Sequence, residues 1–135
     1  MDARTCTILV VEDAKEALHA YAVLLQSSGF NVLTAPNGQE AVRLSPLHHI
    51  DVLLTDLNLP DIPGDILIER LRAQASTPLR IAAITGEATE RQAQARHAGA
   101  DVIFTKPVEW STILRWLEGP SEPRVPPGLD RSTLL

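Results

Sequence analysis

The sequence predicts an α/β fold in which one parallel sheet is covered by helices on both faces. Two observations support this prediction. Short apolar runs typical of fully buried parallel strands alternate with longer segments whose apolar residues recur at helical spacing, and the alternation repeats five times along the 135 residues. Five strand–helix units in succession form a parallel sheet with right-handed crossovers. The chain length is that of a single domain.

The first two units have clear start and stop signals. The expected elements are, in order, strand 8–11, helix 14–28, strand 30–33 and helix 39–44. The residues expected on the inward face of the longer helix are Ala17, Leu18, Tyr21, Leu24 and Leu25. Gly29 is well placed to end this helix in a left-handed conformation. The pair Asn37-Gly38 forms a turn before the shorter helix, which Pro46 stops.

The remaining three units follow the same alternation. The expected elements are strand 50–55, a helix that follows Gly64, strand 80–85, helix 88–98, strand 102–105 and helix 110–117. Pro60, Pro63 and Gly64 punctuate the loop before the third helix. The residues expected to point inward from that helix are Ile66, Leu67 and Leu71. The residues expected to pack the last helix on the sheet are Trp110, Ile113, Leu114 and Leu117.

Composition disfavours several classes of protein. The net charge of −5 argues against nucleic-acid binding, because phosphate backbones attract basic surfaces. Cys6 is the only cysteine, so no intramolecular disulfide or zinc cluster is expected. No apolar stretch reaches the roughly 18–20 residues that span a bilayer, and residues 1–6 have no apolar signal core. A cytoplasmic protein without membrane contact is expected.

The alternating pattern stops near residue 118. From Gly119 the composition changes, and four prolines lie between residues 120 and 127 with no hydrophobic periodicity. We therefore expect a folded domain over 1–118 and a Pro-rich, disordered C-terminal tail over 119–135.

Polar residues stand where the expected strands end. Glu12 and Asp13 follow the first strand, Asp56 closes the third, Thr85 ends the fourth and Lys106 follows the fifth. In an open parallel sheet these ends line one crevice, where ligands bind. Crowded carboxylates repel one another unless a cation sits among them, and their oxygens suit Mg²⁺. A carboxylate can accept a phosphoryl group, whose oxygens magnesium, a lysine and a hydroxyl can then stabilise.

The motifs around these residues resemble those of the receiver domain of the two-component response-regulator family, over residues 6–118. Each motif is weak alone, but their order and spacing together are specific. The matching motifs are Val10-Val11-Glu12-Asp13, Leu54-Thr55-Asp56-Leu57-Asn58-Leu59-Pro60, Pro63-Gly64, Ile84-Thr85-Gly86, Gly99-Ala100 and Lys106-Pro107. The resemblance implies a doubly wound, flavodoxin-like (βα)5 fold with strand order 2-1-3-4-5 and a cis Lys106-Pro107 bond.

The resemblance also implies a role for each site residue. Asp56 would be the phosphoacceptor, Lys106 would pair with the phosphoryl group, and Thr85 would turn inward to bind it. The implied magnesium ligands are Asp13 and Asp56 directly, Glu12 through water and Asn58 through its backbone carbonyl.

One position departs from the family pattern. Many receivers have Tyr or Phe three residues before the lysine as a rotamer switch, whereas this chain has Ile103 there. Phe104 is one residue late and should face the opposite side of the strand. Switching is therefore expected to use helix and loop movement. The helix around 90–98 is a candidate because its apolar residues are only alanines, although a short solvated helix is an equal alternative.

Polar and small residues flank the expected phosphoryl group. Asn58 lies two residues after Asp56, and Gly86 and Glu87 follow Thr85. Asn58 and Glu87 resemble the pairing in chemotaxis-type receivers, in which water has access to the phosphoryl group. A short-lived phosphorylated form is therefore expected.

The implied function is a signalling receiver that takes phosphate from a histidine kinase and switches a protein-binding surface. Its partners would be that kinase, a downstream protein or histidine phosphotransfer protein, and a second copy in a homodimer. A stand-alone receiver without DNA-binding output is favoured, since no helix-turn-helix follows Leu117; a module of a larger hybrid kinase or phosphorelay is the alternative. We expect no enzymatic activity beyond self-catalysed phosphorylation and dephosphorylation.

Two other families share parts of this pattern. An aspartyl-phosphate hydrolase of the haloacid dehalogenase type would need a second aspartate where Asn58 stands, and usually a cap domain. A flavodoxin would need a hydroxyl- and glycine-rich phosphate loop in place of Glu12-Asp13. Both are disfavoured.

Several residues have more than one interpretation. Asp13 alone could simply cap a helix. His48 and His49 precede a strand with no further ligand pattern, which favours a surface pair over a metal site. Trp116 lies about 110° from the centre of the apolar face of its helix, so it is either exposed on a partner surface or covered by core or tail. The partner surface is favoured, because exposed aromatics are enriched at interface hot spots.

Overall fold

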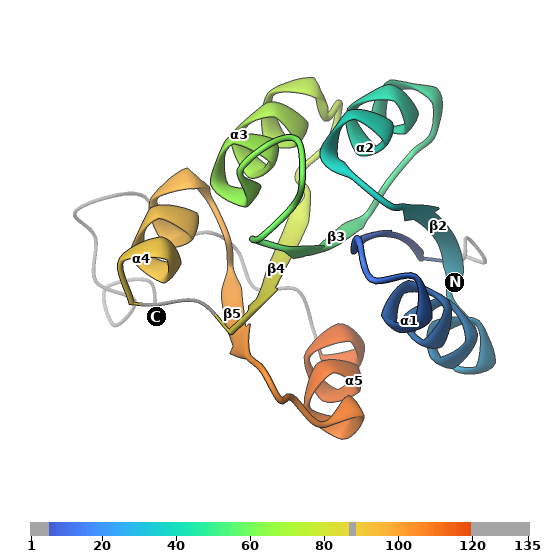
Figure 1. The fold of residues 1–135 in the computed structure, drawn as a ribbon. Helices are drawn as coiled ribbons and strands as arrows, with labels where there is room; N and C mark the ends of the chain where they lie inside the picture. The colour runs from blue at the N-terminus through green and yellow to red at the C-terminus, as the bar shows by residue number, and fades with distance from the viewer. Residues whose placement is uncertain (1–5, 87–88, 120–135) are drawn as a thin grey trace, which may run out of the picture.

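Five strands form one parallel sheet in the order β2-β1-β3-β4-β5 (Figure 1), as the resemblance implied. The computed structural model describes residues 6–86 and 89–119. The strands are β1 Thr7–Val11, β2 Asn31–Ala35, β3 Val52–Asp56, β4 Arg80–Thr85 and β5 Val102–Thr105. In these two ranges, no helix combines the length and the apolar character needed to cross a membrane.

Helices cover both faces of the sheet. They are α1 Lys15–Ser27, α2 Gly38–Leu44, α3 Gly64–Gln74, α4 Thr89–Ala98 and α5 Trp110–Glu118, with a short 3-10 turn η1 Ser45–Leu47 after α2. Helices α1 and α5 lie on one face and α2, α3 and α4 on the other (Figure 1). The Pro-rich segment expected to be disordered lies, apart from Gly119, outside the described residues.

Each face of the sheet has its own apolar cluster, because successive side chains of a strand point to opposite faces. Leu9 and Val11 of β1 pack under α2, α3 and α4, whereas Ile8 and Val10 pack against α1 and α5. The same alternation separates Ile103 from Phe104 on β5, so the prediction that Phe104 faces away from the usual switch position is confirmed.

The register brings the strand ends to one edge. Val11 lies opposite Thr55 in the β1–β3 pair, and Asp56 lies opposite Ile84 in the β3–β4 pair. Thr85 in turn lies opposite Thr105. The residues that directly follow these strands therefore meet at the carboxyl edge of the sheet.

Local signals explain where the first helices end and begin. Gly29 has a φ of 97°, and its N–H bonds to the carbonyl of Gln26 at 3.0 Å, so the expected left-handed helix stop is confirmed. Asn37 caps α2 by accepting a hydrogen bond from the N–H of Glu40 at 2.8 Å. Helix α2 therefore starts at Gly38, one residue earlier than expected.

The predicted inward faces of α1 and α3 are wrong at one residue each. Leu24 and Ile66 are 39% and 42% exposed. In α3 the buried positions are Gly64, Leu67, Ile68 and Leu71. This is the i, i+3, i+4, i+7 spacing of one helix face, and Ile66 lies about 100° away from Leu67. The boundaries of β2 and β3 differ from the expected ones by one or two residues at each end.

Candidate functional site

Three carboxylates meet at the carboxyl edge of the sheet. Glu12 follows β1, Asp56 ends β3, and these strands are direct neighbours. One oxygen from each of Glu12, Asp13 and Asp56 lies within 4.8 Å of the others. Glu12 and Asp56 are buried, at 4% and 7% exposed, whereas Asp13 is exposed. The expected cluster of three carboxylates, called the acidic crevice below, is therefore present at this edge.

Lys106 supplies the positive charge of this crevice. Its Nζ lies 2.8 Å from Oδ2 of Asp56 and 3.5 Å from Oε1 of Glu12. The backbone holds the lysine in place, because its N–H donates to the carbonyl of Thr85 at 2.9 Å. The Lys106-Pro107 bond is cis, as the resemblance implied.

Burial and the neighbouring charges shift the pKa values of two groups in the crevice, Glu12 and Lys106. Burial raises the pKa of Glu12 above its usual value; the N–H of Ala14, 3.0 Å from Oε2, opposes the rise, and the charge of Asp56 adds to it. Burial alone would lower the pKa of Lys106, but the hydrogen bond and negative charge of Asp56, with Glu12, outweigh it and raise that pKa. Lys106 is therefore a permanent cation at neutral pH.

The Asp56 side chain is held at both oxygens. Oδ1 accepts the backbone N–H of Asn58 at 3.0 Å, and Oδ2 accepts Lys106. The hydroxyl of Thr55 donates to the backbone carbonyl of Asp56 at 2.8 Å. These contacts fix the carboxylate at the end of β3 before any ligand arrives, which is the preorganisation that a nucleophile needs.

The residues expected to sense the phosphoryl group lie on the neighbouring strands. Thr85 is fully buried at the end of β4, and Gly86 after it is exposed. Ile103 is half-buried on the α4 side of β5. Glu87 lies outside the described residues. Asn58 is exposed beside Asp56, and the expected access of water at this position stays a prediction.

The expectation that Trp116 is mostly exposed is wrong. Its side chain is half-buried and packs against the α5 side of the core. Its ring forms a T-shaped contact with that of Phe104, with centroids 6.2 Å apart, and the guanidinium of Arg80 lies 4.2 Å from its centroid. The Trp116 ring is partly covered because the side chain of Arg80, at the start of β4, lies over it. A role of Trp116 at a partner surface stays a prediction.

Sequence reasoning missed one residue that shapes the site. Asp61, in the loop between β3 and α3, accepts the N–H groups of Gly38 and Gln39 at 2.9 and 2.8 Å and that of Ile62 at 2.9 Å. It therefore ties the loop that contains Asn58 to the start of α2. An aspartate in a Pro-rich loop signals a turn, but nothing in the sequence indicates that its partners lie on another helix.

Within the described ranges, His48 and His49 belong to no group of residues placed to hold a metal ion. Among the described residues, the group of histidines, cysteines and acids placed to hold a metal is Glu12, Asp13 and Asp56. Nε2 of His49 instead lies 3.1 Å from Oδ1 of Asp51. The interpretation of these histidines as a surface pair is supported.

The donor set of the acidic crevice fits magnesium. Three carboxylates offer hard oxygen ligands, which Mg²⁺ prefers, and one of them, Asp13, is exposed, so that the ion would keep water ligands. Lys106 alone balances only part of the negative charge. A bound divalent cation would balance the rest.

Comparison with known proteins agrees with the motifs. Residues 8–118 match the family model of the response regulator receiver domain. The chain is 36% identical over 101 residues to the cell cycle transcriptional regulator CtrA of Caulobacter vibrioides, covering 74% of this chain and 43% of that protein. It is 34% identical over 100 residues to the transcriptional regulatory protein KdpE of Mycobacterium tuberculosis, covering 74% and 44%. The chain thus matches less than half the length of these relatives.

Solved structures show the same fold. A receiver domain protein from Methanospirillum hungatei superposes with a TM-score of 0.80 at 26% identity, covering 84% of this chain and 91% of that one. A response regulator from Burkholderia pseudomallei, solved with a phosphorylated aspartic acid, calcium ion and citrate, gives a TM-score of 0.76 at 30% identity, covering 82% and 65%. Fold, acidic crevice and family model agree, and the chain belongs to the response regulator receiver domain family of two-component signalling rather than to the hydrolases or flavodoxins.

Proposed function

We propose that this chain accepts a phosphoryl group on Asp56 from a histidine kinase, in the presence of Mg²⁺, and thereby switches a protein-binding surface. The single observation that supports this best is the crevice itself. A buried aspartate at a strand end is paired with Lys106 at 2.8 Å and crowded by two further carboxylates. The Burkholderia relative, solved with a phosphorylated aspartic acid, supports the same chemistry for this fold.

In the proposed transfer a carboxylate oxygen of Asp56 attacks the phosphorus of the donor. The bond from phosphorus to the donor's imidazole nitrogen breaks, its electron pair leaves with the imidazole, and the donor histidine is regenerated. The product is an acyl phosphate on Asp56. The ammonium of Lys106 then pairs with a phosphoryl oxygen, and the hydroxyl of Thr85 turns to donate to another.

Magnesium would be held by Asp13 and Asp56, by Glu12 through water and by the backbone carbonyl of Asn58. When bound, it would neutralise charge on the phosphoryl oxygens and orient them for in-line attack. The protein contributes the fixed position of Asp56, which the N–H of Asn58 and the ammonium of Lys106 hold from two sides.

The proposed switch moves α4 and the loop before it. Ile103 replaces the aromatic residue that many receivers use, and α4 packs through Ala95 and Ala98. Alanine side chains bury little apolar area, so a shift of α4 costs little free energy. The surface so changed would bind a downstream protein, a histidine phosphotransfer protein or a second copy of the chain. No DNA-binding role and no turnover of an external substrate are proposed.

The test is phosphorylation by acetyl phosphate with Mg²⁺, followed by intact-protein mass spectrometry. The wild type should gain the mass of one phosphoryl group, and Asp56→Asn, which is nearly isosteric and cannot attack phosphorus, should gain none. Asp65→Asn makes the same chemical change outside the acidic crevice and should be labelled like the wild type. Full labelling of Asp56→Asn would overturn the acceptor, and sustained turnover of a phosphate ester would indicate a hydrolase instead.

A further inference from the structure

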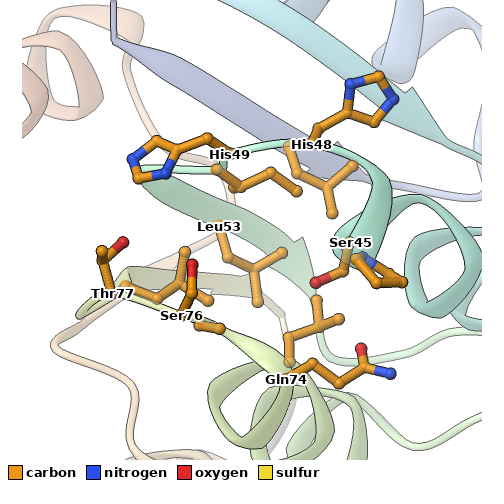
Figure 2. A pocket seen from close by; sticks show the side chains of 13 residues that line it. Ser45, His48, His49, Leu53, Gln74, Ser76 and Thr77 are labelled. Carbon is orange, nitrogen blue, oxygen red and sulfur yellow. The ribbon is translucent and has the colours of Figure 1, made fainter.

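A cavity of about 160 Å³ lies at the amino-terminal edge of the sheet, opposite the edge where Asp56 stands. Two connections form it, the one from α2 into β3 and the one from α3 into β4 (Figure 2). The phosphoryl chemistry proposed above uses none of its residues. Its lining therefore needs a separate explanation.

The floor of this cavity is apolar. Leu9 and Leu53 are fully buried and Leu71 is 1% exposed, and all three line it together with Ile50 and Leu79. Figure 2 shows Leu53 at the centre of the cavity, between the segment of Ser45 and the segment of Ser76. An apolar cavity of about 150 Å³ stays dry and can bind benzene. This cavity therefore has the size and the floor for a single six-membered ring.

The mouth of the cavity is polar, and the ionisable side chains among its described lining residues are the imidazoles of His48 and His49. Its other polar side chains are the hydroxyls of Ser45, Ser76 and Thr77 and the amide of Gln74, and no acid, lysine or arginine of the described part of the chain lines it. Among the described residues that line the mouth, an ammonium group would find no carboxylate, because the nearby carboxylate of Asp51 already faces the imidazole of His49. A neutral hydrogen-bonding group fits this mouth best.

One hydroxyl at the mouth is available to a ligand. Ser45 is half-buried, and its Oγ forms no hydrogen bond with another residue of the described ranges. In Figure 2 this hydroxyl points toward the side on which Leu53 lies. The imidazole of His49 is already paired with Asp51 at 3.1 Å.

We propose that this cavity binds a small neutral aromatic molecule with one hydrogen-bonding group, of the phenol class. The ring would lie on Leu9, Leu53 and Leu71, and the hydroxyl would bond to Ser45 at the mouth. Phenolic hydroxyls are uncharged at neutral pH, since they ionise near a pKa of about 10.

The probe is phenol, titrated into the full chain and followed by amide chemical shifts in two-dimensional NMR. We expect saturable shifts in the residues of the cavity lining and in their neighbours. Ala75→Leu places a larger side chain at a lining position and should abolish binding. Ala73→Leu, the same substitution at an exposed position of α3 outside the lining, should leave binding unchanged.

A second variant keeps the proposal falsifiable if Ala75→Leu does not fold. Ser45→Ala should weaken phenol binding about 3- to 10-fold, the effect of one lost hydrogen bond, and leave the binding of toluene unchanged. The absence of saturable shifts, shifts that spread away from the lining, or equal affinity of wild type and Ser45→Ala for phenol would each overturn the proposed site.

Discussion

Trp116→Ala tests how α5 is attached to the sheet, and the structure gives the size of the effect. The edge contact with Phe104 contributes about 0.5–1.5 kcal/mol, and the guanidinium of Arg80 over the ring contributes about 0.5–2 kcal/mol. A fully buried Trp→Ala change costs about 3–5 kcal/mol, and this ring is half-buried. The contributions overlap, so we expect a loss of about 2–3 kcal/mol in the free energy of unfolding.

The substitution isolates the ring contacts. Arg80 also donates to the backbone carbonyls of Trp116 and Leu117 at 2.9 and 3.4 Å, and these bonds remain when the side chain is removed. Urea unfolding followed by far-UV circular dichroism measures the loss without relying on tryptophan fluorescence. Trp116→Phe keeps a ring in place and should lose less than half as much. A loss below about 1 kcal/mol, the cost typical of exposed sites, would refute the packing described.

Three further predictions concern the carboxyl edge. Asp13→Ala should raise the melting temperature measured without Mg²⁺, because it removes like-charge repulsion, and it should weaken Mg²⁺ binding. The control Glu69→Ala, on the exposed surface of α3, should change neither the melting temperature nor Mg²⁺ binding. If millimolar Mg²⁺ leaves the melting temperature of the wild type unchanged, the metal site is contradicted. Leucine at Asn58 or Glu87 should lengthen the lifetime of the phosphorylated form by excluding water, and equal decay in all three proteins would argue against this path. Burial alone would raise the pKa of Asp61, but backbone N–H donors outweigh it and lower that pKa below 3.8. The stabilising contribution of the ionised carboxylate is therefore present above pH 3.8 and is lost as the pH falls through the lowered pKa. Asp61→Asn should lower the free energy of unfolding by about 1 kcal/mol at pH 7 and by progressively less in urea titrations at more acidic pH, and a loss independent of pH would refute the contacts.

The sequence predicts that the charged side chains of the crevice lie close together, because strand ends in a parallel sheet converge. Glu12 and Asp56 follow or close neighbouring strands, so their proximity follows from the register. Lys106 follows β5, which β4 separates from β3, and its long side chain spans that distance to Asp56. The structure adds the distance between the two groups, 2.8 Å from Nζ of Lys106 to Oδ2 of Asp56. The strand order that brings these ends together came from the family resemblance and not from the periodicity of the chain.

Other features depend on contacts between segments far apart in the chain. Ile66, Leu67 and Ile68 form a continuous apolar run, so periodicity alone fits more than one inward face, and packing against the sheet selects Leu67 and Ile68. Trp116 lies on the flank of its helix, where only the reach of Arg80 from β4 decides whether the ring is covered. The bonds of Asp61 to α2 likewise join residues 22 and 23 positions apart. Local patterns do not encode such pairs.

The charge balance of the crevice connects its stability with its function. Glu12 and Asp56 are both buried, and Lys106 is the cation that contacts them within the described ranges. A phosphoryl group on Asp56 adds further negative charge, so the arrangement observed here can persist only if a divalent cation offsets it or if neighbouring groups move. Helix α4 packs through the small side chains of Ala95 and Ala98, and Arg72 of α3 donates to the carbonyl of Ala98 at 2.8 Å. We therefore expect phosphorylation to act first on the segment between β4 and α4, because Thr85 stands at its start and the buried side chains of the helix at its end are alanines, which bury little apolar area.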